Sequence, residues 1–110
     1  MESRSTIDVE KPMRKDSEKL LERKLVELCK KRGGMCIKLA TLHTFGLPDR
    51  LCLLPGGRAF FVELKTTGQK PRKVQMLVHN KLRELGFEVH VVDNITDLQQ
   101  LLNADREQFT

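Results

Sequence analysis

Two short apolar segments separated by a pair of glycines constrain the fold of this chain most strongly. Residues 49–55, DRLCLLP, and residues 58–65, RAFFVELK, are rich in strand-forming side chains. The two glycines at 56–57 lie between them, where a tight turn needs residues that tolerate positive φ angles. The pattern predicts an antiparallel hairpin.

The length of the turn decides which side chains face one another across this hairpin. A two-residue turn would place Asp49 opposite Leu64, whereas a three-residue loop over residues 55–57 would place Asp49 opposite Glu63. We predict the three-residue loop. Lys65 then lies on the same face as Glu63, because side chains along a strand alternate between the two faces of a sheet.

Two carboxylates placed side by side need a compensating cation. At about 4 Å they repel by roughly 1 kcal/mol in water and by roughly 4 kcal/mol at the effective dielectric of a protein surface. Lys65 offsets part of this repulsion and a divalent cation offsets more, with oxygen ligands favouring Mg²⁺ or Mn²⁺ over zinc. Asp49, Glu63 and Lys65 therefore predict metal-assisted cleavage of a phosphodiester bond, the chemistry of a nuclease. The alternative is that Asp49 begins a strand after a turn, while Glu63 and Lys65 form a solvated ion pair on an edge strand.

Length and charge favour one domain with a polyanionic partner. The chain has 110 residues and a net charge of +5. Because it has five Phe but no Trp or Tyr, we expect contacts with phosphates more than base stacking. No apolar run is long enough to span a membrane and no signal sequence opens the chain. We therefore expect a cytoplasmic protein with no membrane partner and no small-molecule cofactor.

The cysteines and histidines indicate no second site. The three cysteines are Cys29, Cys36 and Cys52. They are odd in number and lack Cys-x-x-Cys spacing, so we interpret them as reduced core residues. His43, His79 and His90 are scattered without ligand spacing, and a zinc site is not expected. His43 lies near the predicted site and could contact substrate.

Hydrophobic periodicity predicts the element order αβββαβα after a basic, aperiodic arm over residues 1–15. Asp16 or Ser17 can cap a first helix that ends near Arg32. Strands are predicted at 35–41, 49–55, 58–65 and 87–92, and helices at 73–85 and from Ile95, after a cap at Asn94. The second helix carries on one side the apolar residues Val74, Leu77, Val78, Leu82 and Leu85. We place the domain at residues 16–103 and a tail at 104–110.

The first helix offers a third carboxylate. On a helical wheel Glu18 lies about 35° from the mean apolar direction, Glu22 about 75° and Glu27 about 145°. A carboxylate within a buried stripe is costly unless it is paired or binds a metal, so Glu18 is the first candidate and Glu22 the reserve. The alternative for Glu18 is that it faces solvent in the first turn and favours the helix dipole.

Five segments agree in order and spacing with one family. They are Ser17-Glu18, Gly33-Gly34 followed by Lys38, GLPDR at 46–50, FVELK at 61–65, and Gln75 followed by Leu82 and Gly86. The chain resembles the VRR-NUC branch, the virus-type replication and repair nucleases, of the PD-(D/E)XK nuclease superfamily over about residues 16–102. The resemblance implies an α/β, restriction-endonuclease-like αβββαβ core, in which a mixed central sheet is flanked by helices.

The resemblance also implies residue roles. The ligands of Mg²⁺ or Mn²⁺ would be Asp49, Glu63, the backbone carbonyl of Leu64 and, directly or through water, Glu18. Lys65 would orient or deprotonate the attacking water and stabilise charge on the phosphate. Gln75 would position Lys65 or the water.

Several basic residues are candidate contacts for DNA. Lys38 could bind the scissile phosphate or cover apolar surface with its stem. The other candidates, each of which could instead be a solubilising charge, are Arg50, Lys70, Arg72, Lys73 and, in the arm, Lys11, Arg14 and Lys15.

The resemblance extends to the substrate. Stand-alone phage or bacterial members of the family are similar to small resolvases that act as dimers on four-way (Holliday) junctions. We therefore expect a homodimer acting on branched DNA, since a two-fold symmetric junction needs paired cuts. The alternatives are a non-catalytic protein that binds branched DNA and a nuclease that acts on linear duplex.

Overall fold

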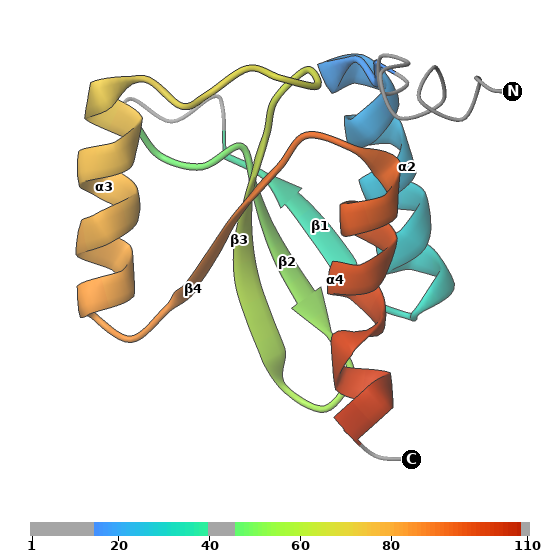
Figure 1. Ribbon diagram of the computed structural model, residues 1–110. Helices are drawn as coiled ribbons and strands as arrows, with labels where there is room; N and C mark the ends of the chain where they lie inside the picture. The colour runs from blue at the N-terminus through green and yellow to red at the C-terminus, as the bar shows by residue number, and fades with distance from the viewer. Residues whose placement is uncertain (1–14, 40–45, 109–110) are drawn as a thin grey trace, which may run out of the picture.

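The structure is a computed structural model that describes residues 15–39 and 46–108 of the chain. In these residues the elements follow the predicted order αβββαβα (Figure 1). They are α2 (Glu18–Lys31), β1 (Met35–Lys38), β2 (Arg50–Leu54), β3 (Arg58–Leu64), α3 (Lys73–Glu84), β4 (Glu88–Val92) and α4 (Ile95–Gln108). None of the described helices is long and apolar enough to cross a membrane.

One sheet with strand order β1-β2-β3-β4 separates two helical layers. β2 runs antiparallel to both β1 and β3, while β3 and β4 run parallel, so the sheet is mixed as predicted. Figure 1 shows α3 on one side of the sheet and the pair α2 and α4 on the other. This is the predicted α/β core.

The hydrophobic core lies between the sheet and the α2–α4 pair. Its fully buried members include Leu21 and Leu25 of α2, Phe60 and Val62 of β3, and Leu98 of α4. On β3 the residues at even positions point into this core. Glu63, at an odd position, must therefore face the other layer, toward α3.

The hairpin adopts the predicted three-residue loop. Leu54 pairs with Arg58, and residues 55–57 connect them. The two loop glycines have φ angles of 91° and 84°, in the left-handed region that disfavours other residues. The register prediction is confirmed.

The packing of α3 differs from the expectation based on its apolar side. Its buried residues are Gln75 and His79, while the side chains of Leu77 and Leu85 are 70% and 61% exposed. The reason is the face that α3 covers: Glu63 points toward this helix, and polar side chains turn inward to meet it. The hydrophobic pattern of α3 alone therefore predicts the wrong buried face.

Some predictions fall on residues that the structure does not describe. The N-terminal arm with Lys11 and Arg14, the last two residues of the first predicted strand, and His43 lie outside the described residues. Within them, the first strand spans Met35–Lys38.

Candidate active site

The hairpin register brings the two predicted carboxylates together. Arg50 pairs with Val62, so Asp49, one residue earlier, lies opposite Glu63. Oδ2 of Asp49 accepts a hydrogen bond of 2.8 Å from the backbone N–H of Leu64. This bond holds the Asp49 carboxylate against the end of β3, beside Glu63.

Glu63 is almost fully buried, with 1% of its surface exposed. Its Oε2 accepts a hydrogen bond of 2.8 Å from Nε2 of Gln75 and lies 3.4 Å from Nζ of Lys65. Its Oε1 is buried without a hydrogen-bond partner among the described residues. A buried carboxylate oxygen left unpartnered in this way is costly unless a cation or a donor completes the site.

The pKa of Glu63 is raised to about 7. Burial is the largest cause and the nearby carboxylate of Asp49 adds to it, while the positive charge of Lys65 acts in the opposite direction. The site therefore holds more negative charge than its single ammonium can balance. Asp49 and Glu63 supply oxygen ligands only, which is the donor set that hard divalent cations such as Mg²⁺ and Mn²⁺ prefer.

Gln75 is fixed at both ends of its amide. Its Oε1 accepts a hydrogen bond of 2.8 Å from the backbone N–H of Arg72, which caps the start of α3. Its Nε2 donates to Glu63. The Gln75 side chain therefore links the start of α3 to the carboxylate, although it contacts Glu63 and not Lys65 among the described hydrogen bonds.

His79 is a member of the site that we interpreted as an ordinary histidine from the sequence. It is 1% exposed, and its Nε2 lies 3.7 Å from Oε1 of Glu63 without a hydrogen-bond partner among the described residues. Burial lowers the pKa of His79, and the charge of Arg83 lowers it further. The available signal was spacing: His79 follows Gln75 by one helical turn, so a helix that turns Gln75 inward also turns His79 inward.

The two carboxylates of α2 that were candidates for the site have different environments. Glu18 is exposed in the first turn, where its backbone N–H donates to Oγ1 of Thr66 at 3.3 Å, so the helical wheel overstated its burial. Its charge still contributes to the raised pKa of Glu63. Glu22, the reserve candidate, is paired with Arg50 at 2.6 Å on the face of the sheet that packs against α2.

The basic candidates fall into two groups. Lys38, Lys70, Arg72 and Lys73 are exposed, and three of them lie in or just after the segment that leads into α3. The side chain of Arg50 is only 13% exposed, and its guanidinium donates to Glu22 and to the backbone carbonyl of Cys36. The side chains of the first group are therefore accessible from solvent, whereas Arg50 is engaged inside the protein.

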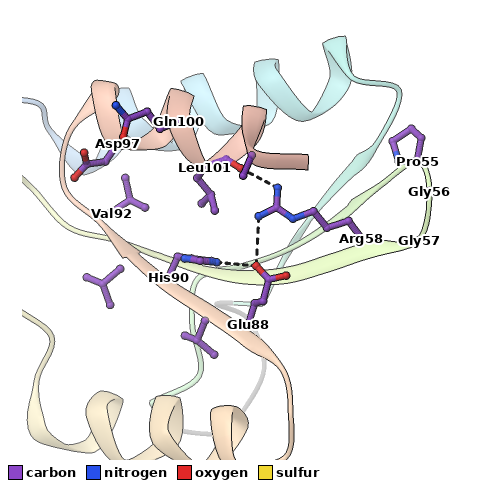
Figure 2. Close-up of a pocket in the computed structure, with 13 residues that line it drawn as sticks. Pro55, Gly56, Gly57, Arg58, Glu88, His90, Val92, Asp97, Gln100 and Leu101 are labelled. Carbon is purple, nitrogen blue, oxygen red and sulfur yellow. Dashed lines mark hydrogen bonds and ion pairs between the residues drawn. The ribbon is translucent and has the colours of Figure 1, made fainter. Parts of the chain in front are cut away.

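A separate hollow lies at the far end of β3. Arg58, the first residue of β3, reaches across it to the backbone carbonyl of Leu101 at 2.8 Å and to Glu88 at 3.3 Å, and His90 contacts Glu88 at 2.9 Å (Figure 2). Arg58, Glu88 and His90 in its wall are bonded to one another or to the backbone, and Asp97 is bonded to Asn94. The carboxylate pair, at the other end of β3, is therefore the better candidate for chemistry.

Comparison with known proteins identifies the family. No family model matches the sequence. The chain is 40% identical over 92 residues, 84% of its length, to "Putative nuclease p44" of Acyrthosiphon pisum secondary endosymbiont phage 1, of which it covers 98%. A solved structure described as a VRR_NUC domain superposes with a TM-score of 0.72 at 29% identity, covering 80% of this chain and 97% of that one. The chain therefore belongs to the VRR-NUC family of nucleases.

Proposed function

We propose that this protein is a metal-dependent, structure-specific DNA endonuclease that hydrolyses phosphodiester bonds in branched DNA such as four-way junctions. The observation that carries the proposal is the environment of Glu63, a buried carboxylate with one unpartnered oxygen, beside Asp49 and within 3.4 Å of Lys65. A site made only for stability would not keep this arrangement, because two adjacent carboxylates repel and burial adds to the penalty.

Asp49, Glu63 and the backbone carbonyl of Leu64 would hold a Mg²⁺ or Mn²⁺ ion, with exposed Glu18 acting through water. Such an ion, when bound, polarises the scissile phosphate and acidifies water for attack. Gln75 holds Oε2 of Glu63 in place, so that Oε1 is the oxygen left to bind a cation.

Lys65 would orient the attacking water, or take its proton, and stabilise the charge that builds up on the phosphate. The attacking water gives up a proton, to the neutral amine of Lys65 or to bulk water, and its oxygen forms a bond to phosphorus. The bond between phosphorus and the leaving sugar oxygen breaks, and that oxygen takes up a proton from bulk water. The amino group of Lys65 lies on the same side of the strand as Glu63, two residues further along the chain. Both groups can therefore act on the same phosphate.

The preference for branched DNA and the homodimer are proposed from the family resemblance. The exposed cluster of Lys70, Arg72 and Lys73 supports contact with phosphates, because it lies at the start of α3, the helix that supplies Gln75 and His79 to the site. Two copies related by a two-fold axis would make the paired cuts that a symmetric junction requires.

Cleavage assays on a labelled four-way junction, a flap and a linear duplex of matched sequence, in Mg²⁺, in Mn²⁺ and in chelator, test this proposal. We expect metal-dependent cutting that favours the junction. Lys65→Ala and Asp49→Ala should each lower the rate by a factor of about 10² to 10⁴. Lys81→Ala and Glu27→Ala, which remove the same charges from exposed helix positions, serve as matched controls and should cut like the wild type.

The alternatives give different results in the same assay. Tight binding of the junction without cutting in either metal would contradict the nuclease and favour a non-catalytic binding protein. Equal cutting of junction and duplex would contradict the preference for branched DNA. A monomeric mass for the protein bound to a junction, measured by light scattering, would contradict the homodimer.

A further inference from the structure

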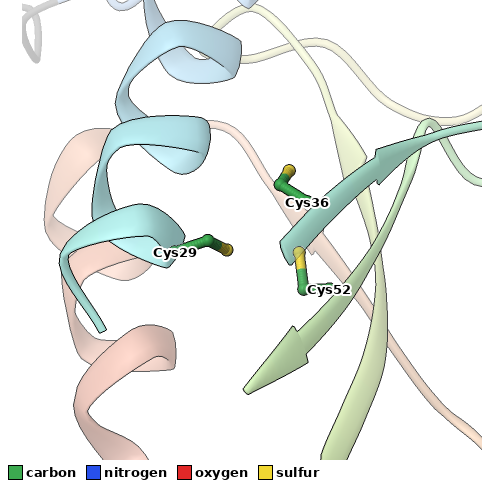
Figure 3. Close-up of side chains that lie close together, drawn as sticks. All are labelled: Cys29, Cys36 and Cys52. Carbon is green, nitrogen blue, oxygen red and sulfur yellow. The ribbon is translucent and has the colours of Figure 1, made fainter. Parts of the chain in front are cut away.

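Three thiols converge on the face of the sheet opposite the carboxylates. Cys29 of α2, Cys36 of β1 and Cys52 of β2 have their sulfur atoms within 4.8 Å of one another, and all three are free (Figure 3). Cys36 and Cys52 lie directly opposite each other on neighbouring strands. No Cys-x-x-Cys spacing links them in the sequence, where we interpreted them as reduced core residues; only the fold brings them together.

The cluster is partly open and lies beside a positive charge. Cys29 and Cys52 are fully buried, whereas Cys36 is half-buried on the edge strand β1, so Cys36 is the most exposed member of the cluster. Arg50 donates from Nη1 to the backbone carbonyl of Cys36 at 3.1 Å, and its Nε is buried without a hydrogen-bond partner among the described residues.

The cluster favours an anionic sulfur. Hydrogen bonds from the thiols of Cys29 and Cys52 lower the pKa of Cys36, and the guanidinium of Arg50 lowers it further. The thiol of Cys36 and burial raise the pKa of Cys29, and the two neighbouring thiols and burial raise the pKa of Cys52. Without metal, one thiolate, at Cys36, is therefore favoured. The other two thiols would lose their protons when a metal binds. Thiolate is the form in which cysteine binds metals. The Nε–H group of Arg50 is the kind of donor that supports a metal-bound sulfur from outside the ligand shell.

We propose that Cys29, Cys36 and Cys52 bind one Zn²⁺ ion through three thiolates, with a water completing the tetrahedron on the open Cys36 side. Zinc–sulfur bonds of about 2.3 Å place the sulfurs of a tetrahedral site about 3.8 Å apart. The sulfurs here need to approach by at most about 1 Å to reach that spacing, given their present limit of 4.8 Å. Three thiolates around Zn²⁺ leave one net negative charge, which Arg50 faces.

This site is independent of the proposed nuclease function. Cys52 of β2 points into the core beside α2, whereas Asp49, just before β2, lies against the end of β3 beside Glu63, which faces α3. Sulfur ligands select soft or borderline ions, whereas the Asp49–Glu63 pair selects hard ones. Bound zinc would tie α2 to β1 and to β2, the strand that follows Asp49, and would therefore stabilise the fold.

The test uses the full chain, reduced and stripped of metal with a chelator, and titrated with Zn²⁺ and with Cd²⁺. Cadmium bound to thiolates gives a near-ultraviolet charge-transfer band that oxygen ligands do not give. We expect one equivalent of either ion per chain, the band with Cd²⁺, and a melting temperature that rises by several degrees with Zn²⁺. Asp49→Ala is the matched control for the other metal site and should bind both ions in the same way.

Cys36→Ser, at the half-buried ligand, should abolish the band and the rise in melting temperature while the circular dichroism of the fold is kept. A second measurement does not depend on any variant: Zn²⁺ should slow alkylation of the half-buried Cys36 thiol of the wild type at least tenfold. A folded wild type that binds neither ion would overturn the proposal and leave three core cysteines. Unchanged binding in Cys36→Ser, or a Cys36 thiol that Zn²⁺ does not protect, would also overturn it.

Discussion

At the scale of single residues, Glu63 makes the stability of the metal-free protein depend on pH. Its pKa in the folded chain is about 7, above the ordinary value of 4.5. Below pH 4.5 the group is protonated in both folded and unfolded chains and carries no penalty. As the pH rises from 4.5 to 7 the unfolded chain ionises first, so the folded state loses roughly 3 kcal/mol of relative stability.

Glu63→Gln removes this titration and keeps an oxygen that accepts from Gln75. In chelator at pH 7.5 we expect the variant to be more stable than the wild type by up to roughly 3 kcal/mol, with the difference vanishing near pH 4.5. Urea unfolding at both values of pH measures it. Added Mg²⁺ should stabilise the wild type and not the variant. A wild type and variant with parallel pH profiles would contradict the raised pKa.

Gln75 positions Glu63, and its removal should affect activity more than substrate binding. Gln75→Ala loses the hydrogen bond to Glu63 and the one from the N–H of Arg72 that caps the start of α3. We expect kcat to fall by about 10- to 100-fold with little change in KM, the usual size for a residue that orients a metal ligand. Gln99→Ala, at an exposed position of α4, is the matched control. A change confined to KM would contradict a positioning role.

At the scale of elements, Asp16 connects the start of α2 to the start of α4. Ser17, and not Asp16, caps α2, by accepting from the N–H of Leu20 at 3.1 Å. Asp16 is buried, and its Oδ2 instead accepts from the N–H of Ile95 at 2.9 Å. Its backbone also pairs with Thr67, at 2.8 and 3.0 Å. Through its side chain and its backbone, this one residue therefore holds together three segments that are distant in sequence.

Asp16→Ala should lower the free energy of unfolding by about 1–2 kcal/mol, because it removes the acceptor of the part-buried first N–H of α4. Chemical denaturation measures the change. Glu27→Ala, which breaks only the exposed pair with Lys24, should change stability by less than about 0.5 kcal/mol. Equal effects of the two substitutions would show that Asp16 does not cap α4.

The two helices α2 and α3 show when the hydrophobic pattern of a helix is sufficient to predict its buried side. On α2 the buried residues, Leu21, Leu25 and Cys29, all belong to the apolar side of the helix, because this helix packs on an apolar sheet face. The pattern failed for α3, whose inward residues Gln75 and His79 are polar. A wheel assumes that the buried side of a helix is its apolar side, and that assumption does not hold where a helix covers a charged site.

At the scale of the whole molecule, the positive net charge should govern DNA affinity. Replacing Lys70, Arg72 and Lys73 together by alanine removes three candidate phosphate contacts. We expect weaker junction binding and a slope of log Kd against log salt that is shallower by about 2.7 if all three contact phosphate. The control is a variant in which three exposed residues of α2, Lys19, Arg23 and Lys30, are replaced together by alanine. It removes the same charge and should keep most of the salt dependence of junction binding. Equal losses would indicate that net charge alone acts.

The sequence by itself determined the hairpin, its register and the α/β order, because these depend on local pattern: strand alternation, a glycine turn and helix caps. It also determined that Asp49, Glu63 and Lys65 lie close together, because the hairpin register sets which residues of the two strands face each other. Only the tertiary structure brought His79 to Glu63, paired Glu22 with Arg50, and gathered the three cysteines. These contacts join different elements, and their geometry follows from how helices pack on the sheet, which no local pattern encodes.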